Sequence, residues 1–158
     1  MNFAEAVTVI LDHEGGYIDD RKDPGGETKF GISKRQYPNL NIKKLTVGEA
    51  MDIYRKDYWD KAKVIKVPSN LQLIYFDMVV NQGKRRAVKI LQEALNGKGV
   101  PTEVDGGIGP TTIGNLKKAN LEPERLRSYR IKYYADLVNR KPTLERYWYG
   151  WYRRAKKT

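Results

Sequence analysis

The sequence contains no cysteine and a single histidine, His13. The lack of cysteine excludes disulfide scaffolds, thiol nucleophiles and cysteine-based zinc sites, and it leaves the redox compartment open. A Ser-His triad would have to use His13. Because one histidine is a poor basis for a metal site, we expect no metal and no other cofactor.

Long apolar runs are also missing. No uninterrupted apolar stretch approaches the ~20 residues that a membrane-spanning helix needs. The start, MNFAEAVTVILDHE, has no basic leader and reaches Glu5 before an apolar run develops. We therefore expect no transmembrane segment and no signal peptide. A protein made in the cytoplasm would then need a separate export route to reach an outside substrate.

Acidic residues are few relative to basic ones, with 19 Asp and Glu against 30 Lys and Arg, a formal charge of +11. Such an excess indicates a polyanionic partner, which can be nucleic acid, an anionic membrane or an acidic cell envelope. The 158 residues fit one compact domain or one domain with two lobes. The 11% of aromatic residues, most of them tyrosine, can supply the core.

The N-terminal third predicts one helix followed by a hairpin. Apolar residues at helical spacing predict a helix that is capped by Asn2 and ends near Glu14, because Gly15 and Gly16 follow. The helical period then disappears until residue 33. A Pro-Gly-Gly turn and the alternating stretch TKFGIS predict a small β-hairpin there.

Helices follow to the end of the chain. Two capping boxes, TVGE at Thr46 and SNLQ at Ser69, predict helices of roughly 46–60 and 69–82, and Gly83 ends the second. Further helices are expected over 84–96, from Pro110, from Pro123 to about Arg140, and after Thr143 as a cap. The stretch VDGGIGPTT predicts a structural loop in which Asp105 binds local backbone amides.

These elements predict a mainly α fold with a small N-terminal β-hairpin and a helical C-terminal lobe. The change in composition near Gly83 and Lys84 predicts two lobes, 1–83 and 84–158, which can also form one compact domain.

Glu14 stands where the first helix should end. The unpaired carbonyls of a helix C-terminus disfavour a carboxylate there and favour the neutral acid. Glycosidases use such an acid to protonate the leaving group, beside a second carboxylate that activates water or stabilises the oxocarbenium ion. Asp19, Asp20 and Asp23 are candidates for the second group. The alternative is a solvated glutamate followed by an ordinary Asp-Pro-Gly-Gly turn.

The stretch HEGGYIDDRKDPGGETKFGIS resembles the signature of the glycoside hydrolase family 108 N-acetylmuramidases. In that family, Glu-Gly-Gly-Tyr carries the catalytic acid, and an Asp-Pro-Gly-Gly-x-Thr-x-x-Gly-Ile segment follows. The similarity continues through YRKDYWDKA and FDMVVNQG. KILQEALN, VDGGIGPTT and LERYWYGWYRR are similar to the helical peptidoglycan-binding region that these enzymes usually carry.

The resemblance implies a lysozyme-like fold and cleavage of the β-1,4 bond between N-acetylmuramic acid and N-acetylglucosamine in peptidoglycan. Glu14 then becomes the general acid. By a looser analogy with phage-type lysozymes, Asp23 positions or activates the water and Thr28 helps to hold it. The similarity also implies a monomeric phage endolysin released by a holin, or a chromosomal enzyme that serves an export system.

Other candidates allow two interpretations each. Asp77 and Asn81 share a helix face and can contact a sugar, or Asn81 caps the helix and Asp77 pairs with a basic neighbour. Trp59 can stack on a sugar or pack in the core. Tyr17, in the Glu-Gly-Gly-Tyr motif, is a further candidate for substrate contact.

A competing interpretation is a non-catalytic module that binds wall polymer or nucleic acid. Its support is the charge, with aromatic and basic residues interleaved at 125–134 and 145–157. No recognisable nucleic-acid fold motif is present, so we expect peptidoglycan rather than nucleic acid. Within the enzyme interpretation, hydrolysis and lytic transglycosylation both remain open.

Overall fold

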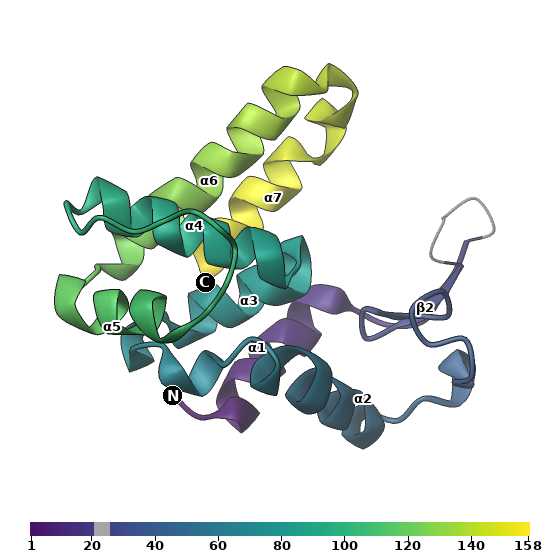
Figure 1. The fold of residues 1–158 in the computed structure, drawn as a ribbon. Helices are drawn as coiled ribbons and strands as arrows, with labels where there is room; N and C mark the ends of the chain where they lie inside the picture. Colours follow the sequence, from purple (N-terminus) through teal and green to yellow (C-terminus); the bar gives the residue numbers. More distant parts are fainter. Residues whose placement is uncertain (21–25) are drawn as a thin grey trace. The chain divides into compact units, whose positions relative to one another are not determined.

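The computed structural model describes residues 1–20 and 26–158 (Figure 1). These residues form two compact units, Asn2–Asp57 and Tyr58–Thr158, with Met1 grouped with the second. The fold is mainly helical with a small N-terminal sheet, which confirms the predicted fold class. No helix in the described ranges combines the length and the apolar character needed to cross a membrane.

In the N-terminal unit, α1 (Phe3–Glu14) begins at the predicted cap. The Asn2 side chain accepts a hydrogen bond from the Glu5 backbone N–H at 2.9 Å, and the Glu5 carboxylate accepts one from the Asn2 N–H at 3.0 Å. This reciprocal pair satisfies two donors that the helix itself leaves free. At the other end, Gly15 has φ 72°, a conformation that favours glycine and stops the helix after Glu14.

Three short strands follow α1 in an antiparallel sheet: β1 (Ile18–Asp19), β2 (Glu27–Lys29) and β3 (Ile32–Ser33). The predicted hairpin is therefore confirmed and extended by one strand. Phe30 and Gly31 join β2 to β3, and both have positive φ values, 53° and 78°. Two such residues between antiparallel strands make the tight turn that matches the natural twist of a sheet.

The predicted helix over 46–60 divides into two kinds of helix. The Thr46 side chain accepts a hydrogen bond from the Glu49 N–H and starts α2 (Val47–Ile53), which follows the short η1 (Ile42–Lys44). The chain then widens into a π-helix, η2 (Tyr54–Asp60).

The C-terminal unit is entirely helical in its regular structure. Helices α3, α4, α6 and α7 pack in sequence, α3 on α4, α4 on α6 and α6 on α7 (Figure 1). The elements are η3 (Val64–Lys66), η4 (Ser69–Leu71), α3 (Gln72–Gln82), α4 (Lys84–Gly97), α5 (Pro110–Ala119), α6 (Pro123–Arg140), η5 (Pro142–Leu144) and α7 (Glu145–Lys157).

Two of the predicted caps are wrong, although their helices exist. Ser69 and Thr143 each lie in a short 3₁₀ turn that precedes the α-helix, and neither helix has a side-chain cap. In the first case the Gln72 side chain, which a capping box would direct backward to the cap, instead donates to the Val67 carbonyl at 2.9 Å. A hydrogen bond to the segment just before the 3₁₀ turn therefore takes the place of the predicted cap.

The loop VDGGIGPTT is structural, as predicted. The Asp105 carboxylate accepts a hydrogen bond from the Gly107 N–H at 2.8 Å, and the buried Gln92 of α4 donates to the same oxygen at 2.9 Å. The Gly107 bond, followed by that of Gln92, lowers the pKa of Asp105. The side-chain carbonyl oxygen of Gln92 also accepts hydrogen bonds from the backbone N–H groups of Asp105 and Gly106, both at 3.0 Å. One side chain therefore shapes the whole loop.

A buried carboxylate joins three helices of the C-terminal unit. Asp77 of α3 is 0% exposed and lies 2.7 Å from Arg130 of α6 and 2.9 Å from Arg154 of α7. Arg130, itself fully buried, also donates to Thr158 at 2.9 Å and to Asn81 at 3.3 Å. The Tyr134 hydroxyl donates to Asn81 as well. Such a network is stable only while every partner is present, because each buried charge needs compensation.

We expect Asp77→Ala to lower the free energy of unfolding by about 3–5 kcal/mol, because it leaves two guanidinium groups without their carboxylate. Urea denaturation measures this change. The matched control is Glu124→Ala, whose carboxylate is 85% exposed in its pair with Arg127 and should contribute less than about 1 kcal/mol. Equal effects of the two variants would contradict a central role for Asp77.

Candidate active site

Glu14 is the last residue of α1 and its side chain is partly buried. Gly15 turns the chain away immediately after it, and the Gly15 N–H closes the last helical bond to Leu11 at 3.2 Å. The carboxylate of Glu14 is therefore carried at the end of a rigid element, beside backbone carbonyls that have no partner within the helix.

The turn between β2 and β3 packs directly against this carboxylate. A β-carbon at Gly31 would lie 2.8 Å from Cγ and from Oε2 of Glu14 and 2.6 Å from the Tyr54 hydroxyl oxygen. All three distances are shorter than a real β-carbon tolerates, and Gly31 also has φ 78°. Only glycine fits here, because both its conformation and its lack of a side chain are needed.

Tyr54 also fixes the turn. Its side chain is 1% exposed, and its hydroxyl donates to the Phe30 carbonyl at 2.6 Å. The arrangement brings together the end of α1, the β2–β3 turn and the start of η2 within the N-terminal unit. Glu14 is thus confined to a narrow set of positions, which is what a proton donor to a bound substrate requires.

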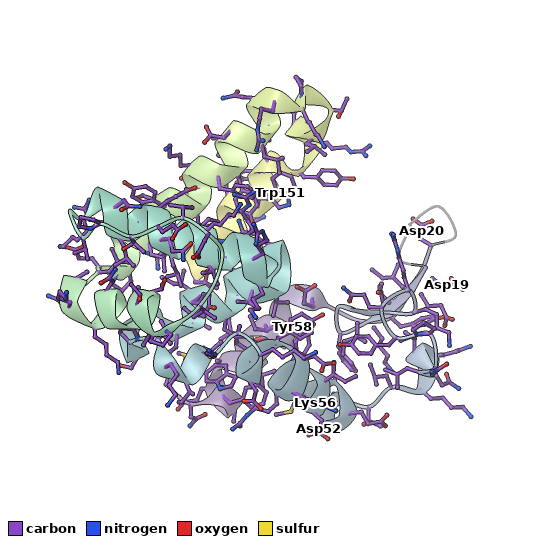
Figure 2. The ribbon with its side chains drawn as sticks, in the orientation of Figure 1. Asp19, Asp20, Asp52, Lys56, Tyr58 and Trp151 are labelled. Carbon is purple, nitrogen blue, oxygen red and sulfur yellow. The ribbon has the colours of Figure 1, made fainter. Side chains whose placement is uncertain are left out.

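Thr28 lies in the middle strand of the sheet, opposite Ile18 of β1 and Ser33 of β3, and is partly buried. Asp23 lies outside the described residues. Asp19, the last residue of β1, and Asp20, which follows it, are both exposed (Figure 2).

Tyr17 contributes a further contact in this unit. Its side chain is 39% exposed, and its hydroxyl donates to the Glu27 carboxylate at 2.9 Å. That hydrogen bond is the main cause that raises the pKa of Tyr17. The register of β1 and β2 places Glu27 opposite Asp19, so the sheet carries a carboxylate that sequence patterns did not single out.

The other predicted sugar contacts belong to the C-terminal unit. Asp77 is enclosed by its two arginines. Trp59 is 2% exposed and makes an edge-to-face contact with Phe76 at a centroid distance of 5.1 Å. These positions favour the ion-pair and core-packing alternatives, because neither side chain can reach a ligand. Asn81 does not cap its helix; it is partly buried between Arg130 and Tyr134.

Two residues of the site were not anticipated as functional. Gly31 and Tyr54 both lie in stretches that resemble the family motifs, but no local pattern connects positions 14, 31 and 54. Their proximity is a product of the fold. Over the described part of the chain, no group of three or more His, Asp or Glu side chains could hold a metal ion.

Comparison with known proteins gives a consistent result for both halves of the chain. Residues 7–83 match a family described as Glycosyl hydrolase 108, and residues 86–156 match one described as Predicted Peptidoglycan domain. Among solved structures, Brucella abortus SagA is similar, with 31% sequence identity and a TM-score of 0.78 over 98% of this chain and 90% of that one. No curated protein sequence matches significantly.

We expect Gly31→Ala to lower the glycosidase rate on the order of a hundredfold, because the added methyl group must displace the Glu14 carboxylate or the Tyr54 hydroxyl. Initial rates at saturating substrate measure this effect. The matched control is Gly48→Ala in α2, where the nearest atom is 3.9 Å from the new carbon and activity should be unchanged. A fully active Gly31→Ala variant would contradict the proposed confinement of Glu14.

Proposed function

The chain belongs to the glycosyl hydrolase 108 family, and from this premise we propose that Glu14 is the general acid of the reaction. The protein is a glycoside hydrolase that acts on peptidoglycan, the polymer named in the description of the family that its second region matches. The observation that carries the assignment is the packing of the Glu14 carboxylate against Gly31, where the Tyr54 hydroxyl also lies. Family membership favours the enzyme over a binding module that lacks catalysis.

In the proposed mechanism, Glu14 donates its proton to the oxygen that joins N-acetylmuramic acid to N-acetylglucosamine. The bond from the anomeric carbon to this oxygen then breaks, and the sugar that remains develops oxocarbenium character. Water attacks the anomeric carbon and gives its proton to a carboxylate. The acid must carry its proton when the substrate binds. After the product leaves, the second carboxylate releases its proton to solvent and Glu14 takes one up, so both groups return to their starting forms.

We propose Asp23 as the second carboxylate, which positions or activates the water, and Thr28 as the residue that helps to hold this water. The support is the order of the motif and the central place of Thr28 in the sheet. Tyr54 acts as a positioning residue, because it contacts the Phe30 carbonyl of the turn on which Glu14 rests.

The division of labour that we propose is catalysis by residues 1–83 and peptidoglycan binding by residues 84–158. The two family matches, which end at 83 and begin at 86, support this division. The compact units instead divide between Asp57 and Tyr58. Helix α3 therefore belongs to the first family region in sequence and packs with the helices of the second.

The charge of +11 supports attraction to the anionic polymers of the cell wall, an attraction that salt should weaken. We further propose that the enzyme works as a monomer without a cofactor. Release by a holin, as in a phage endolysin, and export by another route both stay predictions.

Glu14→Gln should fold normally and lose roughly 10²–10⁴-fold in the rate of peptidoglycan digestion, since the amide cannot replace the acid. Loss of turbidity of a wall suspension measures the rate. The matched control is Asp12→Asn, which changes an exposed carboxylate on the same helix. Full activity of Glu14→Gln would rule out its role as the acid.

Mass spectrometry of the wild-type products then distinguishes two reactions. Reducing sugar ends indicate hydrolysis, whereas anhydro ends indicate an intramolecular transglycosylation.

The identity of the second carboxylate requires its own comparison. We expect Asp23→Ala to lose most of its turnover and Asp20→Ala to keep it, with both variants folded by circular dichroism. If Asp20→Ala is instead the damaging change, Asp20 takes the role that we assign to Asp23.

A further inference from the structure

The C-terminal unit contains a pocket between α4 and α6 that the proposed reaction does not use. Its volume is about 380 Å³, within the range of small-ligand sites. The two helices pack against each other along this region (Figure 1). The lining residues are Arg86, Glu93, Lys132, Tyr133, Asp136, Asn139 and Arg140.

Charges of both signs surround this pocket without pairing. Arg86, Lys132 and Arg140 are cationic, and Glu93 and Asp136 are anionic. Among the residues that the structure describes, none of these five side chains forms an ion pair. Because no ion pair neutralises these side chains, charges of both signs are available to a ligand.

Aromatic rings hold two of the cations in place. The Arg86 guanidinium lies 4.7 Å from the centre of the Tyr133 ring, and the Lys132 ammonium lies 5.9 Å from the centre of the Tyr129 ring. The Arg140 side chain donates to the Asp136 backbone carbonyl at 3.4 Å. These contacts limit the conformations of the cations and leave their charge uncompensated.

The chemistry of the lining selects among the parts of peptidoglycan. Uncharged N-acetylated sugars need aromatic faces and amide or hydroxyl partners. In this lining only Tyr133 and Asn139 supply them, and the five charged groups would be left without a charged partner. The peptides attached to the glycan carry free carboxylates and, before they are cross-linked, a free side-chain amine. A ligand with both signs matches a pocket with both signs.

We propose that the α4–α6 pocket binds the uncross-linked stem peptide of peptidoglycan. Arg86, Lys132 and Arg140 receive its carboxylates, and Glu93 and Asp136 receive its ammonium group. The proposal rests on peptidoglycan as the substrate of the protein. Because cross-linking converts the amine into an uncharged amide, the pocket favours newly made or unlinked regions of the wall.

The test is a calorimetric titration of the full chain with N-acetyl-L-Ala-γ-D-Glu-diaminopimelate. A second titration uses the same peptide with its side-chain amine acetylated, and a third uses chitotetraose. We expect binding of the free peptide and about tenfold weaker binding after acetylation, because one charge-assisted contact is lost. When chitotetraose is present in excess, the titration with the free peptide should be unchanged, because the sugar does not enter the pocket.

Two matched pairs of variants locate the ligand. Glu93→Gln and Lys132→Gln should each weaken peptide binding about tenfold, while Glu103→Gln and Lys117→Gln, which change exposed charges outside the pocket, should not. Thermal unfolding confirms that all four are folded. Equal losses of peptide affinity in pocket and control variants would show diffuse electrostatic attraction and overturn the proposal. Absence of peptide binding, or displacement of the peptide by chitotetraose, would overturn it as well.

The outcome is independent of the role of Glu14, because the peptide contains no glycosidic bond and Glu14→Gln should bind it normally. An active Glu14→Gln variant with intact peptide binding would overturn the mechanism alone. A normal dependence on Glu14 with no peptide binding would overturn this inference alone.

Discussion

The enclosed carboxylate of Asp77 is the constraint on which the helical part of the molecule depends. Two arginines from α6 and α7 reach it, and one of them, Arg130, is as buried as Asp77 itself. A buried charge without its partners is strongly unfavourable. Since Asp77 lies in the catalytic family region and both arginines in the peptidoglycan-binding region, removal of residues 84–158 would take both guanidinium groups away from this buried carboxylate. Helix α3 of the first family region therefore depends on the second region to neutralise its buried charge.

The N-terminal unit depends on a constraint of a different kind, a place where a side chain is forbidden. Gly31 lets the Glu14 carboxylate and the Tyr54 hydroxyl approach the backbone of a turn more closely than any other residue would allow. The backbone of this turn thereby limits the positions that the acid can take. Catalysis would then rely on a fixed proton donor in one unit, and attachment to the wall on the charged pocket of the other.

Local signals in the sequence predict the helices well and their contacts poorly. Asn2, Gly15, Gly83 and the two helix-starting prolines act on their own few residues, and the structure confirms each boundary. Ser69 and Thr143 fail as caps because 3₁₀ turns precede their helices. Asp77 finds a partner 77 residues further along the chain, and no local rule identifies it. Glu14 was marked by its place at a helix end and by family resemblance, whereas Gly31 and Tyr54 join it only through the fold.

The central claim is that Glu14 touches the scissile bond, and a crystal structure of the Glu14→Gln chain with a bound peptidoglycan tetrasaccharide tests it most directly. The account predicts that the side-chain amide of residue 14 lies within hydrogen-bond distance, roughly 3 Å, of the oxygen between the two sugars that are cleaved. A glycan bound elsewhere, or a residue 14 directed away from that oxygen, would contradict it.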